Sequence, residues 1–390
     1  MQVQVINSLE AVSAATWNAL AGTANPFLRH EFLIALERNG SVGPGTGWAP
    51  SHLLLKDGDR LLASAPAYLK TDSWGEFVFD WAWANAYRQA GRSYYPKLVA
   101  AVPYTPATGP RILVANGVDK AQAAGALAEA GRLLCERRQL SSMHWLFPDA
   151  ADADSLRKAG LSLRSGCQFH WTNGGYRDFS DFLDSFSSKK RKNVRRERRQ
   201  AAATGLDFTI VAGNRVEAAD WAAFHDYYRR TFHDHGNLPV LNLGFFQEIG
   251  RTLGSQVVMV QGRDAYGLQA AALLFRSDDA LFGRYWGCRE ERPGVHFETC
   301  YYQGIEYCIR EGLSRFEPGA QGEHKIARGF LPSVTRSCHW IADPGFRRAV
   351  QQFLGHESML IERYMEELHG HSPYRHPPRP HQSANAVTQP

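Results

Sequence analysis

Strand-like and helix-like segments follow one another in nearly the same order twice along this chain. The first series runs from Val3 to Trp171, where the apolar pattern predicts a strand, two helices, three strands and then alternating helices and strands. The second series runs from Leu206 to a long terminal helix over residues 345–369. The repeat is one of topology and not of sequence. It predicts two α/β domains, which either share one fold or are unrelated.

A chain of 390 residues is long enough for two hydrophobic cores. We expect an N-terminal domain over residues 1–175, a basic amphipathic helix and linker over 176–204, and a C-terminal domain over 205–370. Residues 371–390 are rich in Pro, His and polar side chains and are expected to be disordered. With 44% hydrophobic and 21% charged residues, the composition is typical of a globular protein.

The sequence carries no sign of a targeting or membrane-spanning segment. Residues 1–20 lack a basic start followed by an apolar run, and no stretch is apolar enough to cross a bilayer. The six cysteines are dispersed, without the close spacing of a zinc or redox motif. We therefore expect a cytoplasmic protein whose thiols are reduced.

Positive charge is concentrated between Lys189 and Arg199. This segment holds eight basic residues against Glu197 alone, a net charge of +7, whereas the whole chain carries +5. On a helix predicted to begin near Asp178, seven of these cations fall on one half of the circumference and apolar side chains on the other. Cations on one face repel one another unless an anion attends them, which favours a phosphate ligand over a merely solvated face.

Several phosphate carriers would suit such a surface: tRNA, coenzyme A, a nucleotide-linked acceptor or an anionic lipid headgroup, the last through peripheral membrane contact. Two further cations follow a glycine-bearing loop near the end of the second series. The candidate donor-binding and phosphate-binding residues are Lys189, Arg191, Lys192, Arg195, Arg199, Lys325 and Arg328.

Two blocks of the second half resemble Fem-type aminoacyltransferases. The first is the basic segment 187–196 followed by 203–206, and the second joins residues 302–308 and 311–319 to Lys325 and to Arg328-Gly329-Phe330. The whole stretch from about Pro26 to Glu357 more closely resembles the FemAB-like predicted N-acyltransferases, described as bacterial peptidoglycan biosynthesis or recognition proteins. The blocks that carry this likeness are residues 25–27, 47–50, 75–81, 94–98, 103–106 and 319–325.

The resemblance implies an α/β (α+β) fold of tandem GNAT-like domains, with mixed, largely antiparallel sheets flanked by helices. The repeated element order is also that of the GNAT acyltransferase fold. An enzyme of this kind transfers an acyl or aminoacyl group to an amine acceptor, and a cell-envelope precursor is one candidate acceptor. The alternative is a non-catalytic module on the same scaffold that binds RNA or a membrane surface.

The resemblance leaves two kinds of acyl donor, aminoacyl-tRNA and an acyl thioester such as acyl-CoA. CoA-dependent GNAT enzymes cradle the pyrophosphate with backbone N–H groups of a glycine-rich loop before the third helix. Here that place holds residues 289–295, which include two carboxylates and Pro293, a residue without an N–H. Fem enzymes use aminoacyl-tRNA, and the basic segment suits that donor better. No tightly bound cofactor is expected.

Amide formation needs a group that accepts the proton of the amine. Glu298 begins the helix after the central strand and could act as this base, or could instead favour the helix N-terminus by its charge. His324 lies in a glycine-bearing loop and could serve as base or acid near neutral pH, or be structural.

An acceptor cleft is predicted in the first domain, where aromatic and charged residues cluster; core packing and surface ion pairs are the alternative. Its candidate residues are Trp48, Glu76, Asp80, Tyr95 and Lys97. No metal site is expected. The run His296, Glu298, Cys300 lacks the Pro-Cys-x-x-Cys of zinc deaminases, and Gly355-His356-Glu357 lacks the second His of a zincin helix.

Overall fold

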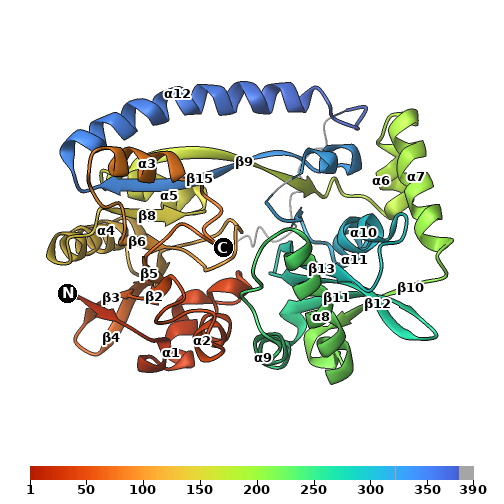
Figure 1. The fold of residues 1–390 in the computed structure, drawn as a ribbon, viewed down its shortest axis with the longest axis horizontal. Helices are drawn as coiled ribbons and strands as arrows, with labels where there is room; N and C mark the ends of the chain where they lie inside the picture. The colour runs from red at the N-terminus through yellow and green to blue at the C-terminus, as the bar shows by residue number, and fades with distance from the viewer. Residues whose placement is uncertain (321, 377–390) are drawn as a thin grey trace, which may run out of the picture. The chain divides into compact units, whose positions relative to one another are not determined.

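The computed structural model describes residues 1–320 and 322–376 and divides the chain into two compact units (Figure 1). Unit 1 comprises Met1–Cys167 and Val334–Met365, and unit 2 comprises Gln168–Ser333 and the chain from Glu366 onward. The segment 334–365, grouped above with the second domain, therefore belongs to unit 1, and the basic segment 176–204 lies within unit 2. The reason is strand pairing: β15 (Leu331–Ile341) is antiparallel to β8 (Ser142–Leu146) of unit 1.

Unit 1 contains two sheets. The smaller is antiparallel, in the order β1-β3-β4-β7, and the strands of the larger run β15-β8-β6-β5-β2, where only β6 and β8 pair in parallel. Their apolar residues and those of α4 (Lys120–Arg137) form one core. The remaining elements are β1 (Gln2–Ile6), β2 (Trp48–Pro50), β3 (His52–Asp57), β4 (Arg60–Ala65), β5 (Ala67–Lys70), β6 (Lys97–Ala100), β7 (Leu113–Val114), α1 (Ala14–Ala21), α2 (His30–Arg38), α3 (Trp81–Gln89), α5 (Ala150–Lys158) and α12 (Pro344–His369).

The strands of unit 2 run in the order β10-β11-β12-β13-β14-β9. Neighbours are antiparallel except β13 and β14, which pair in parallel only as far as Phe282 and Glu317, although β13 continues to Cys288. The parallel pairing of the two strands therefore ends at this point. The elements are β9 (Ser162–Thr172), β10 (Asp207–Ala212), β11 (Val257–Asp264), β12 (Gly267–Arg276), β13 (Ala280–Cys288), β14 (Arg315–Glu317), α6 (Phe179–Asp184), α7 (Ser188–Ala202), α8 (Ala218–Asp234), α9 (Leu243–Leu253), α10 (Val295–Phe297) and α11 (Gln303–Glu311).

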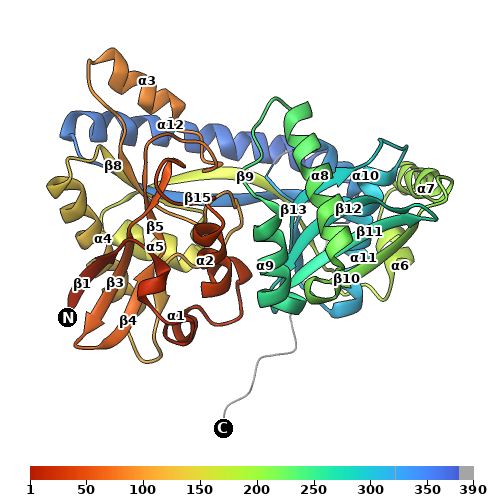
Figure 2. The same cartoon turned by 60° about the horizontal axis from the view of Figure 1, so that its bottom comes forward.

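Helices cover both faces of this sheet (Figure 2). Ile305 of α11 belongs to the core that includes Leu274 of β12. Tyr228 of α8 lies on the other face, where its ring centre is 5.2 Å from that of Tyr285, whose strand partner is Leu273. A strand buried on both faces needs no polar alternation, which explains the continuous apolar run of β12.

The basic segment does not form the single helix predicted from Asp178. It forms α6 and α7, separated at Ser185–Ser187. The physical reason lies in the C-terminal residues: the Ser187 N–H donates to the Pro373 carbonyl at 2.9 Å, and the Arg375 N–H donates to the Ser185 carbonyl at 2.9 Å. Distant backbone thus satisfies groups that a continuous helix would have paired internally.

The predicted disorder of the tail is wrong for residues 371–376. Tyr374 is buried, and its hydroxyl donates to the Gly329 carbonyl at 2.8 Å. Gly329 has a φ of 97°, and a Cβ there would lie 2.7 Å from the Tyr374 oxygen and 2.9 Å from Phe182, so glycine makes room for the tyrosine. The rest of the predicted tail, residues 377–390, lies outside the described residues.

Candidate active site

The cations of α7 divide into an exposed set and one inward-pointing residue, Arg198. The Arg198 Nε donates to Glu298 Oε2 at 3.1 Å, its Nη2 to Glu298 Oε1 at 2.8 Å, and its Nη1 to Glu306 Oε1 at 2.6 Å. Its guanidinium lies 4.4 Å from the centre of the Phe179 ring. Arg198 therefore anchors α7 to the helical segment Val295–Glu311, and the predicted one-sided row of cations is shorter than seven.

Glu197 neutralises one of the predicted phosphate contacts. The Arg328 guanidinium donates to Glu197 from Nε at 3.1 Å and Nη2 at 2.8 Å, and the Tyr302 hydroxyl donates to the same carboxylate. Arg328 also lies over the Phe297 ring, 3.4 Å from its centre. Its charge is therefore directed at α7.

His324 lies where the loop 319–329 approaches the helical segment. Its Nε2 is 3.0 Å from the Tyr301 hydroxyl, and the Arg328 Nη1 donates to its backbone carbonyl at 2.6 Å. Partial burial lowers the pKa of His324, and the charges of Arg328 and Lys325 lower it further. The imidazole is therefore neutral near pH 7 and able to accept a proton.

Lys325 is buried in the same loop, and its Nζ donates to the Gly319 carbonyl at 2.7 Å. Burial lowers the pKa of this amine to about 8. Nearby, burial and the charges of His324, Arg328 and Lys325 lower the pKa of His296 to about 4. Lys325 thus closes the glycine turn rather than facing solvent.

Glu298 lies at the start of a π-helical turn, Glu298–Tyr302, between α10 and α11. Such turns are frequent at functional sites. The side chain is buried, and besides the two bonds from Arg198 its Oε1 accepts one from Gln303 Nε2 at 2.8 Å. Both carboxylate oxygens therefore already accept hydrogen bonds, and the role of Glu298 as a base stays a prediction.

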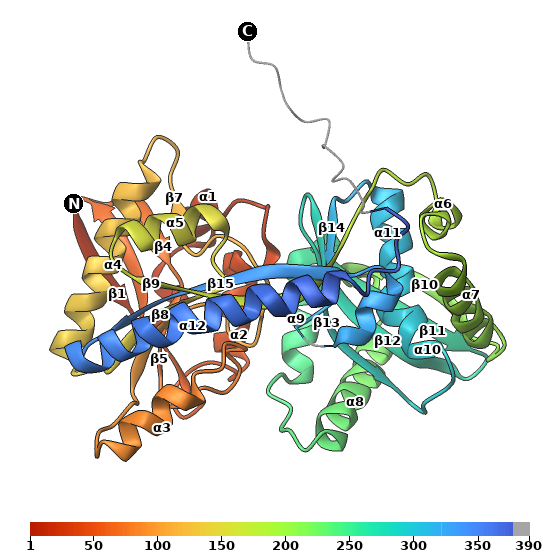
Figure 3. The ribbon, with the colours of Figure 1, turned by 90° about the horizontal axis from the view of Figure 1, so that it is seen from above.

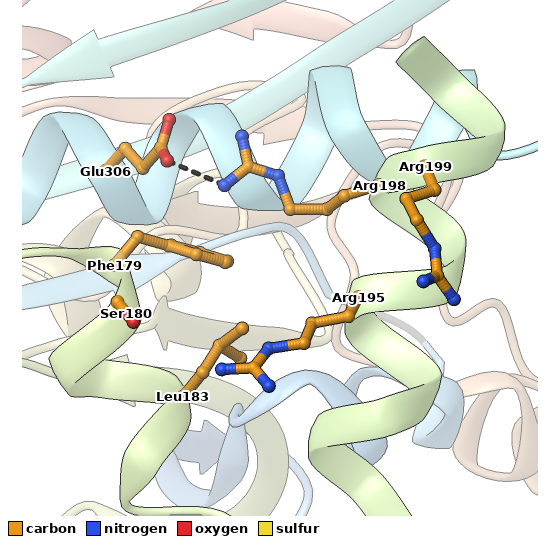
Figure 4. A pocket seen from close by; sticks show the side chains of 7 residues that line it. All are labelled: Phe179, Ser180, Leu183, Arg195, Arg198, Arg199 and Glu306. Atoms are coloured by element: carbon orange, nitrogen blue, oxygen red, sulfur yellow. Dashed lines mark hydrogen bonds and ion pairs between the residues drawn. The ribbon is translucent and has the colours of Figure 1, made fainter. Parts of the chain in front are cut away.

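A surface pocket of about 420 Å³ lies between α6, α7 and α11 (Figure 4). In the part of the chain that the structure describes, Arg195 and Arg199 are exposed on its rim without a carboxylate partner. Figure 4 shows Arg195 and Arg198 reaching from α7 across the pocket. The lining residues are Phe179, Ser180, Leu183, Arg195, Arg198, Arg199 and Glu306.

The other predicted donor contacts are distributed unevenly. Lys189 and Lys192 are exposed on the first turns of α7, whereas Arg191 pairs with Asp184 at 3.1 Å. The structure thus brings Arg195 and Arg199 together at the pocket and places Lys325 and Arg328 beside His324. Their function as donor contacts stays a prediction.

The loop before α10 leaves no room for a pyrophosphate in the position that CoA-dependent enzymes use. A Cβ on Gly294 would lie 2.5 Å from the Glu197 carbonyl oxygen and 2.9 Å from the Ala201 nitrogen. The backbone of α7 therefore covers this loop directly. The residues present do not fit the pyrophosphate of CoA at this helix end.

The candidate acceptor residues of unit 1 form a buried network around Lys97. The Lys97 Nζ donates to Glu76 Oε2 at 2.9 Å, to Asp80 and to Ser73 Oγ at 2.8 Å, and Ser73 Oγ is 2.8 Å from the Tyr95 hydroxyl. Trp48 lies apart and packs on a second buried amine, with the Lys70 Nζ 4.1 Å from its ring centre. Their predicted part in acceptor binding stays untested.

The two carboxylates of this network differ. Burial raises the pKa of Glu76 to about 7, because it outweighs the attraction of Lys97, and Glu76 Oε1 has no hydrogen-bond partner among the described residues. Burial also opposes ionisation of Asp80, but Lys97 and the hydroxyls of Ser73 and Tyr94 outweigh it and lower its pKa.

Sequence reasoning missed several partners of these groups, among them Tyr301, Tyr302, Ser73 and Tyr94. Only Arg198 carried a signal: it lies four residues after Val194 and three before Ala201, the buried residues of α7, so it falls on the inward stripe. Hydrogen bonds from distant tyrosines leave no mark in a local pattern.

The described residues contain neither a metal-binding cluster nor a helix suited to span a membrane. No group of three His, Cys, Asp or Glu side chains there is placed to hold a metal ion. No helix in the same residues is both long and apolar enough to cross a membrane.

The chain belongs to the FemAB-like family, described as peptidoglycan biosynthesis/recognition, whose model matches residues 8–376. Among solved structures, FemX matches with 10% identity and a TM-score of 0.51, over 90% of this chain and 100% of that one. The C-terminal domain of a putative lysylphosphatidylglycerol synthetase from Agrobacterium fabrum matches with 11% identity and a TM-score of 0.52, over 89% of this chain and 96% of that one. A tandem GNAT protein from the clavulanic acid biosynthesis pathway matches with 12% identity and a TM-score of 0.43, over 88% of this chain and 99% of that one.

These likenesses confirm the predicted family and the predicted tandem GNAT-like α/β fold. No curated protein sequence matches the chain significantly.

Proposed function

We propose that the protein transfers an aminoacyl group from aminoacyl-tRNA to an amine acceptor. One observation carries this choice of donor: α7 covers the loop that would cradle a CoA pyrophosphate, while its own Arg195 and Arg199 stand exposed at a pocket. Cations aligned on a helix face suit the phosphates of a polynucleotide. Fem-type enzymes, which the basic segment resembles, take their acyl groups from aminoacyl-tRNA.

In the proposed reaction the acceptor nitrogen attacks the ester carbonyl, a C–N bond forms and the C–O bond to the ribose breaks. His324 takes the proton from the nitrogen, held for this by Tyr301 and by the Arg328 bond to its carbonyl. The protonated His324 then gives this proton to the ribose oxygen as it leaves. Glu298 holds Arg198, and with it the floor of the pocket, in place.

The test is turnover of the purified chain with charged tRNA, and separately with acyl-CoA species, in the presence of pooled amine metabolites. We expect amide formation and loss of the ester with charged tRNA only. His324→Ala is expected to lower kcat by about 10²- to 10⁴-fold without weakening tRNA binding. Turnover of acyl-CoA instead, or full activity of His324→Ala, would contradict the proposal.

The second candidate function is an RNA-binding module without catalysis. One observation favours it: Arg198 engages both carboxylate oxygens of Glu298. Both functions predict that Arg195→Ala/Arg199→Ala weakens tRNA binding and reduces its salt dependence. The matched control is Arg251→Ala, an exposed arginine on α9. Only the enzyme predicts an amide product that disappears with His324→Ala.

A further inference from the structure

Unit 1 carries an exposed aromatic patch on the segment that leads into α3. Trp74 is 66% exposed, Phe79 57%, Trp81 43% and Phe77 38%, all within eight residues of the chain. Large aromatic side chains are usually buried in such numbers. None of the candidate site residues described above is one of these four aromatic residues.

The charged side chains of this segment are buried and its aromatic side chains are exposed, the reverse of the usual arrangement. Glu76 and Asp80 are the ionisable side chains of residues 73–86, and both are buried against Lys97. The exposed side chains of the same residues are the four aromatic rings, alanines and Asn85. A binding partner that covers these rings therefore does not have to desolvate a charged side chain among them.

The patch is held rigidly from beneath. The Trp74 carbonyl accepts from Lys70 Nζ at 3.1 Å and from Trp48 Nε1 at 3.2 Å, and the Phe79 carbonyl accepts from Arg164 Nη1 at 2.8 Å. Phe77 has a φ of 59°, a conformation that costs a phenylalanine energy. Phe77 thus keeps a strained backbone conformation while its ring stays 38% exposed.

The border of the patch is positive. Arg88 is exposed on α3, the helix that Trp81 begins, and Arg348 is exposed on α12 two residues after Phe346, on which Tyr87 of α3 stacks with ring centres 4.0 Å apart. The nearby carboxylates already hold ion pairs: Asp72 with Lys70, Asp343 with Arg92 and Glu357 with Arg164. The free charge around the aromatic rings is therefore cationic.

We propose that this surface, formed by Trp74, Phe77, Phe79 and Trp81 and bordered by Arg88 and Arg348, docks on an anionic membrane. Tryptophan suits the boundary between acyl chains and headgroups because its ring is apolar and its N–H is polar. Neither indole N–H of Trp74 and Trp81 has a partner in the described part of the chain. Figures 2 and 3 both show α3 projecting from the edge of unit 1, as contact with a plane requires.

The experiment is co-sedimentation of the full chain with vesicles of equal parts phosphatidylglycerol and phosphatidylcholine, and with phosphatidylcholine alone. We expect binding to the anionic vesicles that weakens with added salt. Trp74→Ser/Phe79→Ser/Trp81→Ser is expected to weaken it about tenfold or more. The matched control is Tyr266→Ser, which removes an 86% exposed ring from unit 2.

The cations of α7 would also attract anionic vesicles, so each comparison is repeated in the Arg195→Ala/Arg199→Ala background. If the triple variant loses its thermal transition, Trp74→Ser and Trp81→Ser are tested singly. Trp74→Phe/Trp81→Phe should keep binding while reducing the quenching of tryptophan fluorescence by brominated acyl chains. Unchanged vesicle binding of the triple variant overturns the proposal. The proposal is also overturned if the triple variant keeps vesicle binding but loses self-association, or loses binding to a soluble glycan.

Discussion

The two units treat buried charge alike and exposed surface differently. In unit 1, Lys97 is enclosed with Glu76 and Asp80, and the surface above them is aromatic. In unit 2, the buried Glu298 and Arg328 are matched by Arg198 and Glu197, which are partly exposed, and the surface beside them keeps unmatched cations. These interior charges are paired, so what remains outside indicates what each surface binds. An aromatic surface suits an apolar boundary, and a cationic one suits phosphate.

The largest effect should come from removing the enclosed cation of unit 1. Lys97→Met leaves two carboxylates buried without their partner, and we expect a loss of about 3 to 5 kcal/mol in the free energy of unfolding. Arg198→Met also leaves a buried carboxylate, Glu298, but Gln303 still donates to it and the Arg198 side chain is itself 27% exposed, so the loss should be smaller. Urea unfolding of both variants measures the difference. Equal losses would remove the distinction between an enclosed and a half-buried charge pair.

A pH series sharpens the same contrast. Burial raises the pKa of Glu76 to about 7 in the folded chain, whereas in the unfolded chain this carboxyl group keeps its ordinary pKa. As the pH rises toward 7, the unfolded chain therefore loses the Glu76 proton before the folded chain does. Stability should therefore fall as the pH rises through this window, by no more than about 3 kcal/mol. Glu76→Gln should flatten that fall in the free energy of unfolding measured from pH 4.5 to 7.5. An identical slope in both proteins would contradict the buried, partly protonated carboxylate.

The smallest effect concerns unit 2, where the chain beyond α12 completes the core. Tyr374→Phe removes the hydroxyl that bonds to Gly329 while it keeps the ring between Phe182 and Phe186. We expect a loss of about 1 kcal/mol in the free energy of unfolding. Tyr266→Phe, which changes an 86% exposed tyrosine of the same unit, is the control. A larger loss would mean that the hydroxyl positions α6 and α7 as well as bonding locally.

Much of the fold was predictable because it depends on the local periodicity of apolar residues. The repeated element order, the long α12 and the amphipathic character of the basic segment all follow from the spacing of apolar residues. The break between α6 and α7 was not, because it depends on Pro373 and Arg375, which are far away in the chain. Periodicity records which face of a helix is buried and not which remote backbone competes for its hydrogen bonds.

The candidate site shows the same limit. The pattern identified the cations of α7, yet the partner of Arg198 is Glu298, a hundred residues further on, and that pairing decides which cations stay exposed. The cluster in unit 1 was gathered correctly by residue type: Glu76, Asp80, Tyr95 and Lys97 do meet. Its burial was not foreseen, since charged residues are seldom enclosed.

The path of the chain between the units bears on how the protein is made. Domains generally fold as they emerge from the ribosome, the N-terminal one first. Here unit 1 needs β15 and the start of α12, and unit 2 needs Tyr374, so neither is complete until nearly the whole described chain has been synthesised. We therefore expect both units to stay incompletely folded through most of translation and to complete their folding near its end.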